Sequence, residues 1–222
     1  MTVKDFDLPY LTTVSTAIAT FLMGFIDSYT YIQFDGAFAS AQTGNLVLLG
    51  SKLFSAQWTE MLSHIWVFSG FALGTFAGEA VIEKSKHRGQ EKYRIYLLLR
   101  IVLLLLLALF QAVFNSAIML FILGALAGYE LTMFRKFRGT AVTNGIMTGN
   151  TKNMMNKLYK FLFKGDKKAR MDFSSLAWIV IIFLLGAGTG TLVTQYNQAL
   201  NLWIAFGIAL VTFLWTSREL AK

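Results

Sequence analysis

Two acidic residues lie inside apolar stretches of the sequence, where a carboxylate is costly. Asp27 lies within FLMGFIDSYTY (residues 21–31) and Glu130 within FILGALAGYEL (residues 121–131). A charge at the centre of a membrane helix costs about 3 kcal/mol or more, and such residues usually face a bundle interior or a cavity and serve a function. Asp27 could carry a proton or bind a cation. The structural alternative is a hydrogen bond to a neighbouring helix.

The triplet Thr-Gly-Asn occurs twice, at residues 43–45 and 148–150. Glycine permits a sharp turn, and short polar side chains can cap the start of a helix. A helix N-terminus can also hold an anionic or polar group. At membrane depth, non-helical backbone is tolerated only where protein buries it or where it lines a water-filled cavity. The triplets are therefore expected either to line a cavity or to be capping turns between a membrane helix and a surface helix.

The predicted substrate site consists of polar residues in the two triplets and around the two acids: Asp27, Tyr29, Gln42, Thr43, Asn45, Tyr129, Glu130, Thr148 and Asn150. The chain has no cysteine and only two histidines, which argues against a metal cluster. It has no catalytic triad grouping and no phosphate loop of the required spacing. We therefore expect no enzyme, no metal and no cofactor.

Composition indicates a membrane protein. The 222 residues are 55% hydrophobic and only 14% charged, whereas a soluble domain carries about a quarter charged residues. A single membrane domain over residues 1–222 is expected. A membrane-spanning helix needs about 20 mostly apolar residues, and lipid cannot satisfy open backbone groups. Six spans are predicted at residues 12–33, 62–82, 95–114, 117–134, 175–194 and 201–217.

Basic residues predict the orientation of these spans. With six spans, 18 of the 20 lysines and arginines fall on one side, in residues 83–94, residues 135–174 and the two tails. The positive-inside rule then places both termini in the cytoplasm, in a bacterial cytoplasmic membrane. The net charge of +8 is explained by this topology and by contact with anionic lipids rather than by nucleic-acid binding.

The chain is predicted to be a duplication of about 12–114 and about 117–217. Phe21, Gly24 and Tyr29 recur one hundred residues later, and the pattern F-x-L-G-x-x-x-G occurs at both 71–78 and 183–190. Each half has three spans, an odd number, so the halves must have opposite orientations, as in many secondary transporters. The predicted fold is all-α: six transmembrane helices as two inverted three-helix repeats, each with a re-entrant or interfacial Thr-Gly-Asn segment after its first helix.

Segments outside the spans have more than one interpretation. Residues 36–54 are too apolar for an exposed loop, and they form either a re-entrant segment or a true span that would move the N-terminus outside. In the second copy, apolar residues at helical spacing alternate with lysines, which predicts an amphipathic helix at the cytoplasmic interface. Arg100 is expected to pair with Glu79 or to reach the interface. His64 is expected at the outer interface.

The residues GFIDSYTYIQFDGAFASAQTGNLVLLG (24–50) and GYELTMFRKFRGTAVTNGIMTGN (128–150) resemble the two motifs of the YoaK-like family, a group of uncharacterised bacterial membrane proteins with a domain-of-unknown-function label. The resemblance covers most of the chain but implies no activity. The chain has Glu130 where that family favours glutamine. The inverted three-helix plan also looks like half of a major facilitator transporter, an analogy at the level of the fold.

The leading functional expectation is a small transporter or channel-like permease with a polar site at the repeat interface. Its partners would be the bilayer with its anionic lipids, an unknown small molecule or ion, and plausibly a second copy in a homodimer, since six short spans make a thin bundle. The alternative is a non-transporting scaffold or accessory protein whose polar motifs only fix the fold. A water-connected cavity that reaches Asp27 and both triplets favours transport, whereas a dry interior favours the scaffold.

Overall fold

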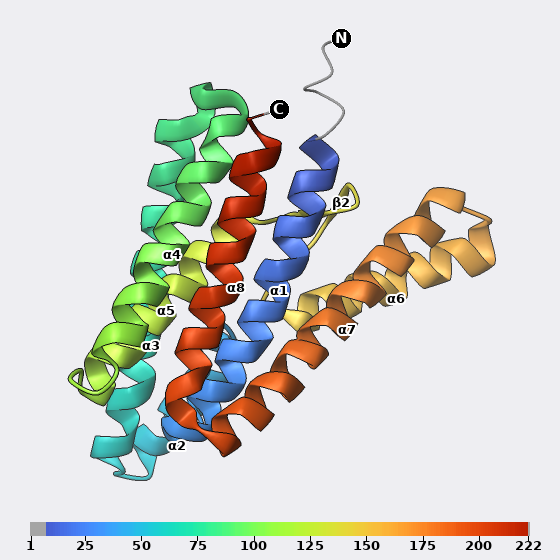
Figure 1. The fold of residues 1–222 in the computed structure, drawn as a ribbon. Coiled ribbons are helices and arrows are strands. Elements are labelled where there is room, and N and C mark those ends of the chain that lie inside the picture. Colours follow the sequence, from blue (N-terminus) through green and yellow to red (C-terminus); the bar gives the residue numbers. More distant parts are fainter. Residues whose placement is uncertain (1–7, 222) are drawn as a thin grey trace.

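The computed structural model describes residues 8–221, which form a bundle of long helices (Figure 1). The long helices are α1 (Leu8–Gln33), α3 (Trp58–Ser85), α4 (Lys92–Phe110), α5 (Ser116–Met133), α7 (Lys167–Tyr196) and α8 (Gln198–Glu219). The shorter elements are α2 (Gln42–Phe54), the 3-10 helix η2 (Lys86–Glu91), the strands β1 (Lys136–Phe137) and β2 (Thr140–Ala141), and α6 (Met147–Lys164). The expectation of a helical protein is confirmed.

Five helical segments of the described chain are long and apolar enough to cross a membrane. The longest, Trp58–Phe110, consists of α3, η2 and α4. It bends at Gly89, whose backbone (φ 54°, ψ −125°) suits a residue without a Cβ atom. Each of the six predicted spans therefore coincides with a long helix, and the chain is a multi-pass membrane protein.

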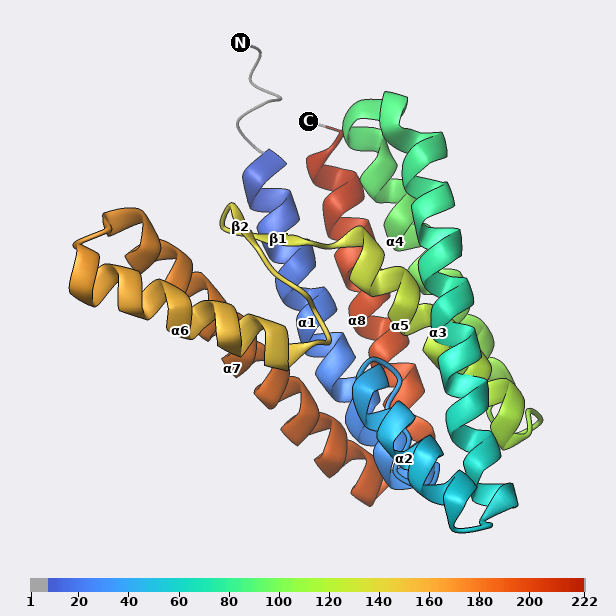
Figure 2. The ribbon, with the colours of Figure 1, turned by 180° about the vertical axis from the view of Figure 1, so that it is seen from behind.

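The helix ends fall into two groups at opposite ends of the bundle. The start of α1, the turn η2 and the end of α8 lie at one end, which we call the terminal end (Figure 1). The turns between α2 and α3, between α4 and α5, and between α7 and α8 lie at the other, which we call the distal end. Helix α7 leans away from the bundle and forms a hairpin with α6 (Figure 2).

Glycines allow close packing in the helix pairs α1–α7 and α3–α5. A Cβ atom at Gly24 or Gly186 would lie 2.2 or 2.1 Å from a carbonyl oxygen of the facing helix in the first pair. At Gly70 or Gly124 it would lie 2.0 or 2.2 Å from a carbonyl oxygen in the second. Small residues commonly let membrane helices approach closely, and no larger residue permits these distances.

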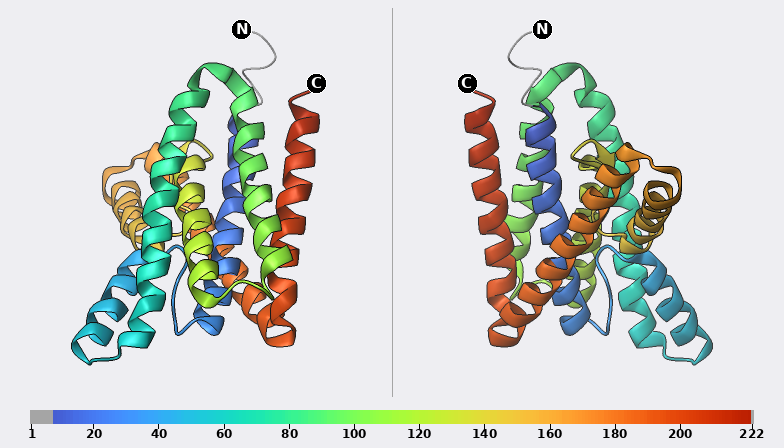
Figure 3. Two further views of the ribbon diagram at one scale, coloured as in Figure 1. Left: turned by 90° about the vertical axis from the view of Figure 1, so that its left-hand side faces the viewer. Right: turned by 90° about the vertical axis from the view of Figure 1, so that its right-hand side faces the viewer.

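Two segments turn back into the bundle from opposite ends (Figures 2 and 3). Residues 34–41 return alongside α1 from the distal end and lead into α2; residues 134–146, which contain β1 and β2, lead into α6. Helix α2 has 13 residues, about 20 Å, too short to cross about 30 Å of hydrocarbon. Helix α2 is accordingly not among the five candidate spans. Below, the word re-entrant describes only the path by which these two segments turn back into the helical bundle.

Both expectations for Arg100, an ion pair with Glu79 or a reach to the interface, are wrong. Glu79 pairs with Arg135, not with Arg100. Arg100 has no exposed surface, so it does not reach the interface either, because α4 turns this residue toward the bundle interior. His64 is also fully buried, and its Nδ1 atom lies 3.5 Å from the Oδ1 atom of Asn45 because α2 packs over this part of α3.

Candidate functional site

The tips of the two re-entrant segments meet inside the bundle. The hydroxyl of Ser40, in the first tip, lies 3.1 Å from the carbonyl oxygen of Gly145 in the second. A Cβ atom at Gly145 would lie 2.3 Å from the Ser40 oxygen, so the close contact requires a glycine. We call this contact the tip junction. It joins segments that enter from opposite ends of the molecule.

Asp27 of α1 holds the first tip. Its Oδ1 atom accepts the backbone N–H of Ser40 at 2.8 Å, and its Oδ2 atom accepts the Ser40 hydroxyl at 2.5 Å. The neighbouring Thr30 hydroxyl accepts the N–H of Ala39 at 3.2 Å. Asp27 is only 4% exposed. Hydrogen bonds to an ionised acceptor are short and strong, and these two make the carboxylate part of the tip junction.

The asparagines of the two triplets make the same contact with the backbone. Asn45 accepts the N–H of Phe38 at 2.9 Å and donates to its carbonyl at 2.6 Å. Asn150 accepts the N–H of Thr143 at 3.1 Å and donates to its carbonyl at 2.6 Å. We call these contacts the asparagine clamps. Each side chain satisfies both polar groups of a residue seven positions earlier, which fixes the turn before α2 or α6.

The triplets do not act as side-chain caps. The residues at the N-cap positions of α2 and α6 make no side-chain cap hydrogen bond. Thr43 and Thr148 are both exposed. Gln42 donates to the Ala39 carbonyl at 2.8 Å and accepts from Asn45 at 2.9 Å. In each triplet the buried polar contacts are therefore made by asparagine.

The two predicted tyrosines lie in the core. Tyr29 is 5% exposed and packs edge-on against Phe34, with ring centroids 5.9 Å apart. Tyr129 is 4% exposed, and its hydroxyl donates to the carbonyl of Tyr96 at 3.0 Å. Both rings join neighbouring structural elements.

A pocket of about 440 Å³ lies against the tip junction, between α1 and α7. Its polar lining residues include Asp27, Ser28, Thr148 and Thr191, and the rest of its wall is mainly apolar and aromatic. Of the predicted site residues, this pocket brings together only Asp27 and Thr148. It could hold a small polar molecule or ion beside a carboxylate.

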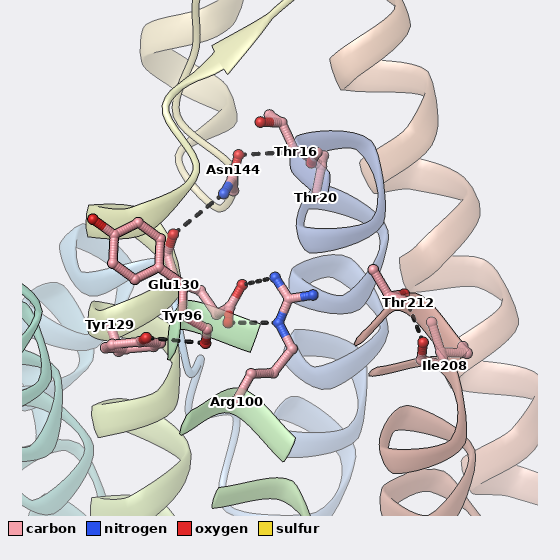
Figure 4. A network of polar contacts seen from close by, with 9 residues as sticks. All are labelled: Thr16, Thr20, Tyr96, Arg100, Tyr129, Glu130, Asn144, Ile208 and Thr212. Atoms are coloured by element: carbon pink, nitrogen blue, oxygen red, sulfur yellow. Dashed lines mark hydrogen bonds and ion pairs between the residues drawn. The ribbon is translucent and has the colours of Figure 1, made fainter. Parts of the chain in front are cut away.

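Glu130 belongs to a second polar network (Figure 4). Its Oε1 atom accepts from the Nε atom of Arg100 at 2.7 Å, and its Oε2 atom accepts from the Nη2 atom of the same guanidinium. Asn144, in the second tip, donates to the Glu130 carbonyl at 3.3 Å and accepts from the Thr20 hydroxyl at 3.3 Å. Both charged side chains are at most 1% exposed. The network connects the second tip to α1, α4 and α5.

The sequence analysis did not identify Ser40 or Asn144. Each is a polar residue three or four positions before a Thr-Gly-Asn triplet. A polar residue at this similar position before both triplets is a signal that could have found them. Their partners Asp27 and Glu130 lie 13 and 14 residues earlier, on α1 and α5, and no local pattern indicates these contacts.

The fold and this site define a multi-pass helical membrane protein with two re-entrant segments that meet inside the bundle. A family described as "Protein of unknown function (DUF1275)" matches residues 16–215. The chain therefore belongs to the DUF1275 family. Neither the curated proteins nor the solved structures contain a significant match.

Proposed function

We propose that the protein is a small membrane transporter or channel-like permease whose polar site is the pocket at the tip junction. The observation that carries the proposal is the position of Asp27. This buried carboxylate lines a pocket of about 440 Å³ and also holds the point where two re-entrant segments meet. Buried carboxylates of this kind commonly mark substrate, ion or proton pathways in membrane proteins.

Matching contacts in the two halves support an inverted repeat. Helix α1 packs on α7 and α5 packs on α3, with a glycine of each helix against a carbonyl of the other. The asparagine clamps use equivalent residues, each bound to a backbone seven positions earlier. In transporters built from inverted repeats, the substrate site lies at the repeat interface and includes broken helices. The tip junction has the corresponding place in this chain.

The Ser40 hydroxyl provides a route by which a proton on Asp27 would alter the junction. A hydroxyl has one proton to donate, and it lies within reach of both the Asp27 carboxylate and the Gly145 carbonyl. When Asp27 is charged, its carboxylate accepts the hydrogen bond from the Ser40 hydroxyl. A protonated Asp27 donates to the Ser40 oxygen instead, and the serine proton is then available to Gly145. Proton binding would thereby strengthen the contact between the two tips.

The proposed setting is a bacterial cytoplasmic membrane with both chain ends in the cytoplasm. The basic segment 83–94 lies at the terminal end of the bundle together with the start of α1 and the end of α8. Cytoplasmic loops carry the excess of lysine and arginine.

The second candidate function is a non-transporting scaffold, which the asparagine clamps favour. The amide side chains of the two triplet regions make their hydrogen bonds within the protein. Asn45 and Asn150 bind nearby backbone, and Gln42 binds nearby backbone and Asn45. The pocket reaches Asp27 and the second triplet but its lining does not include Gln42, Thr43 or Asn45. A scaffold would use the same polar residues only to fix the turns.

Two threonines provide a matched test. Thr43 and Thr148 occupy the same position in their triplets and are both exposed, but only Thr148 lines the pocket. The protein is reconstituted in liposomes, and fluxes of protons, K⁺, glycerol and alanine are measured with an entrapped pH dye and by light scattering. We expect at least one protein-dependent flux, reduced at least about tenfold by Thr148→Trp, because the indole fills the pocket, and unchanged by Thr43→Trp.

Absence of flux for every probe, with protein that is folded and inserted, would favour the scaffold. Equal effects of the two substitutions would contradict the assignment of the pocket as the site. Elution as a single species in size-exclusion chromatography is the folding control for both variants.

A further inference from the structure

A strongly basic pocket of about 690 Å³ lies beside the turn between α6 and α7. It is lined by three cationic side chains and by neighbouring hydroxyl and apolar groups: Arg138, Lys167, Arg170, Ser174, Ser175, Phe161, Met171 and Gly165. No carboxylate is among them. We call this pocket the basic cup. A cup lined by three cations and two serine hydroxyls suits an anion with several oxygen atoms.

The charges of the basic cup have no ion-pair partner in the part of the chain that the structure describes. Within residues 8–221, no ion pair joins Arg138, Lys167 or Arg170 to a carboxylate. The acids nearest in sequence are already engaged: Asp172 accepts from Lys157 at 2.5 Å, and Asp166 caps α7. The cup therefore keeps a positive potential that an external anion can satisfy.

An apolar groove adjoins the cup. A second pocket, of about 320 Å³, runs between α1 and α7, and its lining is largely apolar: Val14, Ala17, Ile18, Phe137, Trp178 and Ile182, with Thr13 and Arg138. Arg138 lines both pockets. A ligand that used both would carry an anionic group and a hydrocarbon chain on the same molecule. A free inorganic anion would bind in the cup and would make no favourable contact with the apolar groove.

Trp178 indicates the depth of this site in the membrane. Its side chain is 47% exposed and lies eight residues after Arg170 on α7, about 12 Å along the helix axis. Tryptophan is enriched at the level of the lipid headgroups. The basic cup is then on the aqueous side of that level. The groove, which Trp178 lines together with Ile182 four residues further along α7, extends from that level toward the hydrocarbon. This is the order of parts in a phospholipid.

We propose that the basic cup and the apolar groove together bind one anionic phospholipid, with its phosphate headgroup in the cup and an acyl chain in the groove between α1 and α7. The lipid would connect the hairpin formed by α6 and α7 to the segment between α5 and α6, because Arg138 and Arg170 belong to these two parts of the chain. Basic pockets between membrane helices commonly bind anionic headgroups. The proposal does not depend on transport.

The first experiment measures lipid binding to the detergent-solubilised protein by native mass spectrometry. Phosphatidylglycerol is titrated, with phosphatidylcholine as the uncharged control. One basic side chain near a lipid surface is worth about fivefold in affinity. We therefore expect Arg138→Gln with Arg170→Gln to weaken phosphatidylglycerol binding about 25-fold. Both arginines are exposed, so the folded state should persist.

Two adjacent lysines provide the matched control. Lys167 lines the cup, whereas Lys168 is also exposed but does not line it. Lys167→Gln should weaken binding about fivefold and Lys168→Gln should leave it unchanged. Equal effects of the two would mean that only the general positive surface attracts lipid, and the site would be wrong.

Val14→Phe tests the groove. This substitution fills the apolar wall and removes no charge, so it should weaken phosphatidylglycerol binding while a melting-temperature shift caused by inorganic phosphate stays as in the unmodified protein. Phosphatidylcholine binding as tightly as phosphatidylglycerol would overturn the headgroup assignment. Two results together would show a site for a free anion instead. Inorganic phosphate would stabilise the protein as much as phosphatidylglycerol does, and Val14→Phe would leave phosphatidylglycerol binding unchanged.

Discussion

The Ser40 hydroxyl lies 3.1 Å from the carbonyl oxygen of Gly145, a residue 105 positions later in the chain. This contact is between two loops, yet it lies in the interior of a helical bundle. Backbone at that depth must find partners within the protein. Asp27, the asparagine clamps and the Asn144 network supply them for the two tips.

Asp27→Asn should preserve the fold. The asparagine oxygen accepts the Ser40 N–H and its amide donates to the Ser40 oxygen, as a protonated aspartate would. Asp27→Ala leaves the buried N–H without its partner and should lower the free energy of unfolding by about 1–3 kcal/mol. Melting temperatures in detergent compare the two. A large loss of stability in Asp27→Asn would mean that the charge itself holds the tip.

Asn45→Ala and Asn150→Ala should each destabilise the protein by about 2–4 kcal/mol. Each substitution removes both hydrogen bonds of its clamp and leaves one part-buried N–H and one carbonyl unsatisfied. Asn45→Ala also removes the hydrogen bond to Gln42. Thr43→Ala, at an exposed residue of the same triplet, should change stability by less than about 0.5 kcal/mol. Thermal unfolding measures all three. Similar melting temperatures for Asn45→Ala and Thr43→Ala would argue against the clamp.

Two glycines of α7 give opposite expectations. A Cβ atom at Gly186 would lie 2.1 Å from a carbonyl of α1, whereas a Cβ atom at Gly188 would have nothing within 4 Å. Gly186→Ala must therefore push α1 and α7 apart and should cost about 1–3 kcal/mol. Gly188→Ala should be neutral or stabilising by up to about 1 kcal/mol, because alanine favours the helix. Melting curves that place the two variants in the reverse order would contradict the observed packing.

The pair Arg100–Glu130 should show strong coupling. Removing one member leaves a fully buried, unpaired charge and should cost about 3–5 kcal/mol. Arg100→Met combined with Glu130→Gln removes both charges and should recover most of that loss. A double-mutant cycle of thermal stabilities measures the coupling. If the double variant loses as much stability as the two single variants added together, the two residues act separately.

Single cysteines can test the orientation, because the chain has none of its own. Arg88→Cys lies in the basic turn η2, and Ala56→Cys lies in the turn between α2 and α3 at the distal end. In intact cells, an impermeant thiol reagent should label residue 56 and leave residue 88 unlabelled until the membrane is opened. Labelling of residue 88 in intact cells would reverse the proposed orientation.

Much of the helical framework follows from local sequence properties. Apolar runs of sufficient length predict every long helix, because hydropathy and backbone hydrogen bonding in lipid leave few alternatives. The glycine rows in α3 and α7 predict close packing, although their spacing does not say which helix faces them. The repeated triplets indicate two equivalent turns, and both occur.

The candidate site could be predicted only in part. Asp27 and Thr148 do line one pocket, but Asn45 and Asn150 bind local backbone, a role that composition cannot distinguish from ligand binding. The neighbouring positions of Glu79 and Arg100 at the ends of consecutive spans favour an ion pair between them or a reach of Arg100 to the interface. The partner of Arg100 is instead Glu130 of α5. Such pairings depend on helix rotation within the bundle, which short polar motifs do not determine.

The packing of α1 against α7 has a consequence for how the chain is made. Helix α1 packs against α7, and α7 begins at Lys167, 134 residues after α1 ends at Gln33. At the usual rate of synthesis the ribosome needs on the order of ten seconds to cover that distance. The pair α3–α5 is complete earlier, so it is available as a template while α1, with its buried aspartate, waits in the translocon or the bilayer.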